Sequence, residues 1–350
     1  MLWVHKYRPT SLESLDYNEP LTETLRRLAD KEDFPHLLVY GPPGAGKKTR
    51  VSCLLRELFG PSALKIKEEQ RVLQAGTRKF DFVLVSSNHH IEINPAEAGN
   101  QDRVVVQELL KEIAQTQPVD VTAKHRFKVV VINEADSLTR DAQAALRRTM
   151  EIYSPNLRLI LLANTTGSIM GPIKSRTLLV RVPAPTTEDI GNVLAKVADA
   201  QDVQLPQDDA ARNQLWQNIS EKSNRNLRRA LLMLETMYAR SEKIDASTQV
   251  PLTDWQLMID RIAQSIVKSR TVQQLASVRK DYYELLTHCI PETVILKELL
   301  FALLPRVSAV AGKNIVDAAA LYDHRLRLGN KGIYHLEAFT ASTMRILEEA

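Results

Sequence analysis

Cysteine is scarce in this 350-residue chain, which has only Cys53 and Cys289. Neither has a second metal ligand at C-x-x-C spacing, and two isolated cysteines do not make a disulfide framework. Residues 1–9 also lack the long apolar core of a signal peptide. We therefore expect a protein of a reducing intracellular compartment, with no metal site built from its own side chains.

Long hydrophobic runs are also missing. The most apolar stretch, residues 294–304, contains Lys297 and Glu298 and is far shorter than the roughly 20 residues that span a bilayer. We therefore expect no membrane partner. The net charge is +4 and the pI about 8.9. Such a mildly basic chain permits nucleic acid as a partner without requiring it.

Strand-like and helix-like patterns alternate between residues 37 and 183. The apolar runs that predict buried strands are 37–40, 82–86, 129–133, 157–164 and 178–182, and the helical patterns are 50–59, 102–115 and 139–153. This alternation predicts an α/β domain with a parallel sheet covered by helices and a ligand at the carboxyl ends of the strands. Beyond Pro183 only helical patterns follow. We therefore expect an α/β domain over 1–183 and two all-helical domains over 184–248 and 249–350.

A phosphate-binding loop follows the first apolar run. In the pattern G-x-x-x-x-G-K-[ST], backbone N–H groups cradle phosphates, the lysine reaches the outer phosphates and the hydroxyl ligates Mg²⁺. The chain matches this pattern up to its last position, where a lysine replaces the hydroxyl. The residues that we predict to bind nucleotide here are Gly41, Pro42, Pro43, Gly44, Ala45, Gly46, Lys47, Lys48 and Thr49.

The second magnesium position is altered as well. P-loop ATPases place an aspartate for the metal and then a glutamate for water at the end of a buried strand. Here the glutamate is kept as Glu134, but the aspartate is Asn133. Because both contacts to one ion are changed, we predict a site that binds nucleotide and hydrolyses it poorly. We favour Lys48 as a substitute for part of the metal's charge; the alternative is a solvent-facing lysine with hydrolysis supported by another ligand.

Several motifs occur in an order that resembles a known family. The motifs are W-V-H-K-Y-R-P at 3–9, the loop at 41–50, N-E-A-D at 133–136, D-A-Q-A-A-L-R-R-T-M-E at 141–151, S-R-T at 175–177 and N-L-R-R-A at 226–230. This set resembles the small subunits of the eukaryotic sliding-clamp loader, replication factor C, of the AAA+ family. The altered magnesium positions resemble those of an end subunit of that assembly.

The resemblance implies an architecture and a set of partners. It implies an AAA+ module over 1–183, a helical lid over 184–248 and a helical collar over 249–350 that joins five subunits into an open spiral. The implied partners are the other clamp-loader subunits of a heteropentamer, the sliding clamp and primer–template DNA, in the nucleus. The implied cofactor is ADP or ATP, with Mg²⁺ absent from this chain's own site.

The resemblance also implies roles for single residues. The family's adenine-pocket segment maps to Val4, Tyr7, Arg8 and Pro9. Its sensor residues map to Asn164 on a strand end and Arg228 in the lid. Arg176 maps to the arginine finger that acts on a neighbouring subunit's ATP, and Glu134 becomes a vestigial base.

One further candidate residue and two alternative functions stay open. Arg103, at the start of a predicted helix, is our candidate for a phosphate contact to DNA, because a helix N-terminus and an arginine together attract phosphate. The chain could instead be an autonomous ATPase that uses Glu134 with an unusual metal arrangement. It could also be a structural relative that binds no nucleotide.

Overall fold

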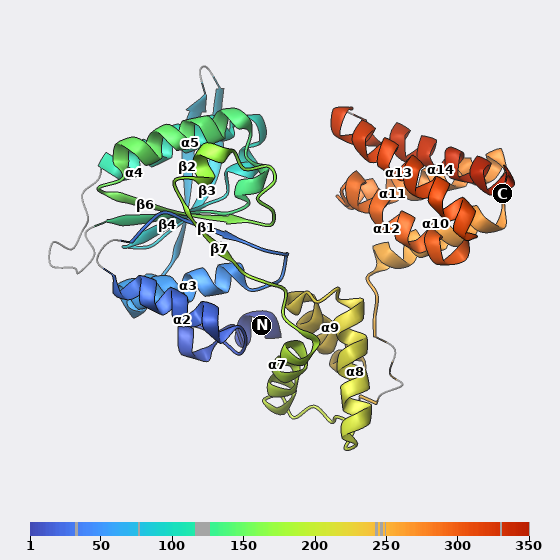
Figure 1. The fold of residues 1–350 in the computed structure, drawn as a ribbon, viewed down its shortest axis with the longest axis horizontal. Coiled ribbons are helices and arrows are strands. Elements are labelled where there is room, and N and C mark those ends of the chain that lie inside the picture. Colours follow the sequence, from blue (N-terminus) through green and yellow to red (C-terminus); the bar gives the residue numbers. More distant parts are fainter. Residues whose placement is uncertain are drawn as a thin grey trace. The chain divides into compact units, whose positions relative to one another are not determined.

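The computed structural model describes residues 1–31, 34–75, 78–115, 127–241, 244–245, 248, 250–329 and 331–349. The chain forms two compact units, Met1–Val250 and Pro251–Ala350 (Figure 1). The first unit contains the α/β segment and the helices that lie between Pro183 and Val250. The second contains only helices and is described by itself.

A seven-stranded sheet with the order β2-β3-β4-β5-β6-β1-β7 organises the first unit. The strands are β1 (Leu37–Tyr40), β2 (Lys67–Ala75), β3 (Arg78–Ser86), β4 (His90–Ile93), β5 (Lys128–Ile132), β6 (Leu157–Ala163) and β7 (Leu178–Arg181). Strands β4, β5, β6, β1 and β7 are parallel, as the sequence predicts for all of them except β4, for which it predicts no strand.

The other edge of the sheet corrects that prediction, because β2 and β3 form an antiparallel hairpin and β3 pairs antiparallel with β4. We expected a strand only at 82–86. Strand β2 reads K-E-E-Q-R-V-L-Q-A. A strand at the edge of a sheet need not be apolar on both faces, so it lacks the continuous apolar run by which the inner strands are found.

Helices cover both faces of the sheet (Figure 1). The helices are α2 (Glu19–Asp30) and α3 (Lys47–Phe59) on one face, and α4 (Asp102–Gln115) and α5 (Arg140–Tyr153) on the other. Successive residues of β5 point to opposite faces: Val129 and Val131 join the α2/α3 cluster, and Val130 and Ile132 join the α4/α5 cluster. Both faces are therefore buried, which is why the inner strands β1, β5 and β6 are apolar along most of their length.

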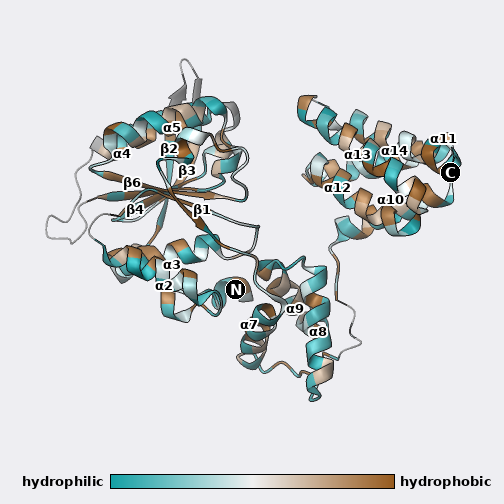
Figure 2. Cartoon of the chain, viewed as in Figure 1, coloured by the Kyte–Doolittle hydropathy of each residue, from teal (hydrophilic) through white to brown (hydrophobic). Residues whose placement is uncertain are grey.

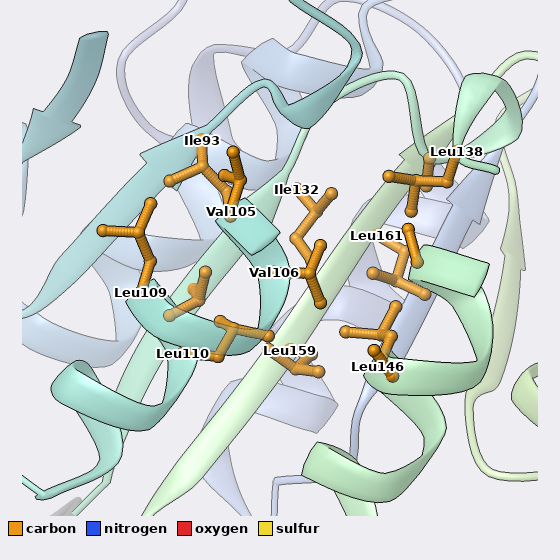
Figure 3. Close-up of a cluster of buried hydrophobic side chains, with 14 of the residues drawn as sticks. Ile93, Val105, Val106, Leu109, Leu110, Ile132, Leu138, Leu146, Leu159 and Leu161 are labelled. Atoms are coloured by element: carbon orange, nitrogen blue, oxygen red, sulfur yellow. The ribbon is translucent and has the colours of Figure 1, made fainter. Parts of the chain in front are cut away.

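Figure 3 shows the cluster on the α4/α5 face. Val106 and Leu110 from α4 and Leu146 from α5 meet Leu159 from β6, and each of these side chains is fully buried. Figure 2 shows the same division along the chain: the inner strands are hydrophobic along most of their length, whereas the helices carry hydrophobic and hydrophilic residues in turn. Burial on one side of each helix and on both sides of the inner strands explains this pattern.

A helical subdomain, which we call the lid because it occupies the position of the predicted lid, completes the first unit. It consists of α7 (Thr187–Asp199), α8 (Asp209–Lys222) and α9 (Leu227–Arg240), and the short helix α1 (Trp3–Lys6) packs against it. Trp3 is buried in its core, with its ring centroid 5.3 Å from that of Tyr238. The Trp3 backbone N–H donates to Glu235 Oε2 at 3.1 Å. The start of the chain is thus fixed to helices more than 180 residues later in sequence.

The second unit is a bundle of α10 (Asp254–Lys268), α11 (Val272–Thr287), α12 (Glu292–Leu303), α13 (Ala309–Leu328) and α14 (Gly332–Glu349). Leu299 and Leu303 of α12 are fully buried in its core, whereas Phe301 of the same helix is exposed. Tyr282 and Thr340 join α11 to α14 by a buried hydrogen bond of 2.6 Å. In the described residues, no helix has the length and hydrophobicity needed to cross a membrane.

Short helical segments connect these elements. They are the helix α6 (Gly171–Lys174) and the 3₁₀ turns Leu12–Ser14, Pro61–Leu64, Pro95–Gln101, Ala135–Ser137 and Leu304–Arg306. The turn Pro95–Gln101 leads from β4 directly into α4.

Candidate nucleotide site

The glycine-rich loop runs from β1 to the start of α3. Gly44 and Gly46 both have left-handed backbone conformations, with φ of 73° and 76°. A Cβ atom on Gly44 would lie 1.8 Å from Oδ1 of Asn226 in the lid. Glycine is therefore required where the lid approaches the loop. The first N–H groups of α3 have no partner within the helix, so the loop ends in a set of donors suited to phosphate.

Lys47 lies inside this loop and is held by three oxygens. Its Nζ donates to Gly41 O at 2.7 Å, to Pro42 O at 2.9 Å and to Asn164 Oδ1 at 2.9 Å. Burial lowers the pKa of Lys47 from its usual value, and the Asp136 carboxylate opposes this effect. The predicted sensor Asn164 is thus in direct contact with the predicted phosphate-binding lysine. All three acceptors are neutral, so phosphate can replace them.

Lys48 points to a different partner. Its Nζ lies 2.6 Å from Oε2 of Glu92 on β4, and the exposed fractions of the two side chains are 43% and 8%. The lysine is therefore not simply solvated. Our sequence analysis missed Glu92; the available signal was a lone acidic residue inside the apolar run I-E-I at 91–93.

The two residues that follow β5 face the same cavity as the lysines. The Asn133 backbone N–H donates to Ile93 O at 2.9 Å, which fixes this strand end to β4. Glu134 has a left-handed conformation, with φ of 50° and ψ of 43°. Such values are uncommon for residues other than glycine and occur often at functional sites. The cavity has a volume of about 480 Å³, and its lining includes Lys47, Lys48, Glu92, Asn133, Glu134, Asn164 and Arg228.

A second cavity of about 420 Å³ shares Gly44, Gly46, Lys48 and Arg228 with the first. The four residues predicted to contact the base, Val4, Tyr7, Arg8 and Pro9, all line it. The lid contributes apolar side chains from α7 and α9, namely Val193, Val197, Leu227, Leu231 and Leu232. This largely apolar cavity with a few polar groups suits a planar base, and the first cavity, which is more polar, suits phosphates. We call them the base cavity and the phosphate cavity.

Hydrogen bonds hold the N-terminal segment in this position. Arg8 Nε donates to Thr49 Oγ1 at 3.1 Å, and Tyr7 Oη donates to Ala200 O at 3.3 Å. Burial lowers the pKa of Arg8 from its usual value, and the Glu92 carboxylate opposes this effect. Thr49, the last residue of the predicted loop, therefore lines the base cavity itself and also fixes Arg8 there.

The lid places its arginine at the mouth of both cavities. Arg228 lies in the first turn of α9, and the Asn226 side chain caps that helix by accepting the Arg229 N–H at 3.1 Å. Asn226 is also the residue that approaches Gly44. A single helix start thus positions the predicted sensor and contacts the phosphate loop.

Arg50 is a second residue that our sequence analysis missed. It is 1% exposed, and its guanidinium donates to Tyr17 O at 2.6 Å and to Thr22 Oγ1 at 2.9 Å. Tyr17 Oη in turn donates to Ala45 O in the loop at 2.7 Å. Burial lowers the pKa of Arg50 from its usual value. These contacts support the loop from behind.

Arg176 lies elsewhere. Arg176 is not among the described residues that line the two cavities. It follows α6, where its Nη1 donates to Pro172 O at 2.9 Å and its Nη2 lies 2.6 Å from Glu151 Oε1. Its side chain is 33% exposed. The arginine is therefore held at the surface of the α/β module, away from the chain's own site.

Arg103 is exposed in the first turn of α4. The neighbouring Asp102 is buried, and its carboxylate accepts the Thr139 N–H at 2.7 Å and the Thr139 hydroxyl at 2.9 Å. Because Thr139 caps α5, this carboxylate joins the N-termini of α4 and α5. In the described residues, no three His, Cys, Asp or Glu side chains gather as a metal-ligand group.

A phosphate loop at the carboxyl edge of a parallel sheet, approached by a helical lid, is the arrangement of an AAA+ module. Comparison with protein families supports this class. Residues 192–239 match the "RCF1/5-like, AAA+ ATPase lid domain", residues 255–350 match the "Replication factor C subunit 3, C-terminal domain", and residues 17–186 match "DNA polymerase III, delta subunit". The chain belongs to the replication factor C family, whose members are subunits of the sliding-clamp loader of DNA replication.

The relatives are similar over their whole length. Replication factor C subunit 5 of Neurospora crassa is 56% identical, and the match covers 99% of this chain and 97% of that protein. Replication factor C subunit 3 of Homo sapiens is 48% identical, with 99% and 96% covered. Among solved structures, a RuvB protein of Thermotoga maritima matches with a TM-score of 0.51 and 16% identity over 75% of this chain and 79% of that one. At that identity the RuvB likeness concerns the fold alone.

Proposed function

We propose that this chain is the clamp-loader subunit that holds ADP or ATP without magnesium and lends Arg176 to a neighbouring subunit's ATP. It acts in the nucleus within a heteropentamer, together with the sliding clamp and primer–template DNA. Its α/β module, lid and collar extend over 1–183, 184–248 and 249–350. The observation that carries the proposal is that Lys48 and Asn133 line the same cavity as Lys47 and Glu134.

The two unusual residues balance one another in charge. In a complete site, Mg²⁺ contributes +2 and the aspartate −1, which leaves +1 beside the phosphates. Here the Lys48 ammonium contributes +1 and the Asn133 amide is neutral, so the same two positions again sum to +1, apart from the carboxylates Glu92, Glu97 and Glu134 that also line the cavity. Either substitution alone would change this sum. A divalent ion fits poorly here, because Mg²⁺ is usually bound through carboxylates and phosphates, whereas Asn133 is neutral and the Lys48 ammonium already pairs with the Glu92 carboxylate.

The position of Arg176 supports action on a neighbour. The Arg176 guanidinium is partly exposed and held at the surface of the α/β module. An arginine finger stabilises the charge of the transition state and can raise the rate of hydrolysis by about 10³–10⁵. A competing function, ATP hydrolysis at the chain's own site, is favoured by Glu134, which faces the phosphate cavity. The two proposals place the catalytic contribution in different residues.

Two variants in the reconstituted complex separate these proposals. Arg176→Ala should slow clamp-stimulated ATP hydrolysis strongly, whereas Glu134→Gln should change it little, because its site lacks magnesium. Hydrolysis at the chain's own site gives the opposite order. Arg181→Ala, which removes an exposed arginine from nearby β7, is the matched control. Size exclusion must show full assembly in each case.

The nucleotide itself provides a separate test. The purified chain should release ADP or ATP when it is denatured by heat after treatment with EDTA. An empty preparation from cells that supply both nucleotides would favour the structural relative. Normal hydrolysis by fully assembled complexes with Arg176→Ala and with Glu134→Gln would also favour the structural relative.

A further inference from the structure

We infer that Glu92 is a positioning residue for the bound nucleotide. Its buried carboxylate anchors the Lys48 ammonium beside the phosphates, so Lys48 stands where the metal would bind and Glu92 holds it there. This inference rests on the proposed function, that the site holds nucleotide without a metal, and adds to it a carboxylate that lies on a different strand from Asn133.

The register of the sheet places Glu92 under the phosphate loop. Glu92 is aligned with Val131 of β5, two residues before Asn133. Its neighbours Ile91 and Ile93 pack in the α4/α5 cluster. Because successive residues of a strand point to opposite faces, Glu92 points to the α3 face, where the first turn of α3 carries Lys48. The resulting distance from Oε2 to Nζ is 2.6 Å.

Burial makes this contact persistent. The Glu92 side chain is 8% exposed, and a buried carboxylate that loses its cation is strongly destabilised. Lys48 is therefore held in place. Lys47 differs, since its three acceptors are neutral oxygens that phosphate can replace. We expect nucleotide to move Lys47 and to leave Lys48 on Glu92.

An ammonium can serve both groups at once. The contact with Glu92 is an ion pair without hydrogen-bond geometry, so the three N–H donors of Lys48 can turn to phosphate oxygens while the ammonium stays beside the carboxylate. Mg²⁺ bridges a carboxylate and phosphates in the same way. Within 4 Å of the Glu92 carboxylate, the other cation-forming group among the described residues is His90, whose Nε2 lies 3.9 Å from Oε1; Arg8 interacts with this carboxylate from farther away. Burial lowers the pKa of His90, which favours its neutral form and leaves Lys48 as the paired cation.

A second glutamate in the same cavity provides a matched control. Glu97 also lines the phosphate cavity, but it is exposed and accepts a hydrogen bond from Asn94 Nδ2 at 2.8 Å. Glu97→Gln and Glu92→Gln each remove one negative charge near the phosphates. Only the second removes the anchor of Lys48. If the two carboxylates acted only by repelling the phosphates, both variants would bind nucleotide more tightly than the wild type.

The experiment measures the release of a fluorescent ADP analogue from the 350-residue chain in excess EDTA. Glu92→Gln should release it about ten-fold faster than the wild type, as expected for the loss of a charge-assisted contact. Glu97→Gln should stay within about two-fold, the range of small surface effects. Lys48→Met should behave like Glu92→Gln. The double variant should be no faster than Lys48→Met alone, because both changes remove one pair.

Different results overturn different statements. Rapid release from the wild type in EDTA contradicts the proposed metal-free site. Retention by the wild type with equal or slower release from Glu92→Gln overturns the positioning role, since Glu92 would then only oppose the phosphates. If Glu92→Gln does not fold, the double variant with Lys48→Met replaces it, because it leaves no unpaired charge. Wild-type retention by that variant also overturns the inference.

Discussion

Arg176 and Glu151 form an ion pair in which the guanidinium Nη2 lies 2.6 Å from the carboxylate Oε1. The same oxygen lies 3.3 Å from Arg147 Nε. Glu151 lies in the last turn of α5, so this ion pair joins the proposed arginine finger, Arg176, to a helix that covers the sheet. Both side chains are partly exposed, with fractions of 33% and 45%. Because exposed ion pairs contribute little, a neighbouring phosphate can compete for the guanidinium.

The first prediction concerns this pair. Glu151→Gln should change ATP hydrolysis by the assembled complex by less than about five-fold, because an exposed pair is weak. Arg176→Ala should have a much larger effect, since it removes the charge itself. Steady-state hydrolysis at saturating ATP measures both. An equally large loss in the two variants would show that the finger depends on Glu151 for its position.

A second prediction concerns DNA. Arg103→Ala should weaken DNA binding by the complex, and the slope of log affinity against log salt should shrink by about one, as expected for one phosphate contact. Base sequence should have little influence. Lys111→Ala removes one exposed charge from the last part of the same helix and serves as the control. An unchanged slope for an assembled Arg103 variant would exclude this residue from the DNA surface.

His36 predicts a dependence of stability on pH. Its Nδ1 accepts the Leu159 N–H at 3.0 Å, and burial, with a contribution from Arg158, lowers its pKa from 6.5 to about 4. Between these two values the unfolded chain binds a proton that the folded chain does not. The free energy of unfolding should therefore be highest above pH 6.5 and fall by about 2–3 kcal/mol as the pH drops to 4.

Urea unfolding at several pH values tests this prediction. His36→Asn keeps an acceptor for Leu159 and should show a smaller loss of stability in acid. His288→Asn changes an exposed histidine of the second unit and should leave the wild-type dependence intact. The same pH dependence in all three proteins would assign the effect to other groups.

The fourth prediction concerns the helical bundle of the second unit. Tyr282 Oη donates to Thr340 Oγ1, which itself donates to Leu336 O at 3.0 Å. Both side chains are fully buried. Tyr282→Phe should lower the free energy of unfolding by about 1–2 kcal/mol, because Thr340 loses its donor without access to water. Tyr283→Phe, at the exposed neighbouring position, should have no measurable effect in the same denaturation experiment.

The predictable parts of the site lie close together in sequence. The strands β1, β5 and β6 were predicted correctly, because inner parallel strands are apolar on both faces. The glycine-rich loop was recognised from its fixed local pattern, and its binding of phosphate stays a prediction. The hairpin of β2 and β3 was found only in part. Strand β4 was missed altogether, since it is four residues long and carries His90 and Glu92.

The sequence by itself determined the glycine-rich loop pattern, the presence of Lys48 and Asn133 at its two unusual positions and the membership of a family, because each depends on residue types at short spacing. Only the tertiary structure decided that Lys48 meets Glu92, that Arg176 meets Glu151 and that Trp3 enters the core of the lid. These contacts join residues distant in sequence. They depend on which strands are neighbours and on which face each side chain points to, and strand order is set by packing of the whole unit rather than by any local pattern.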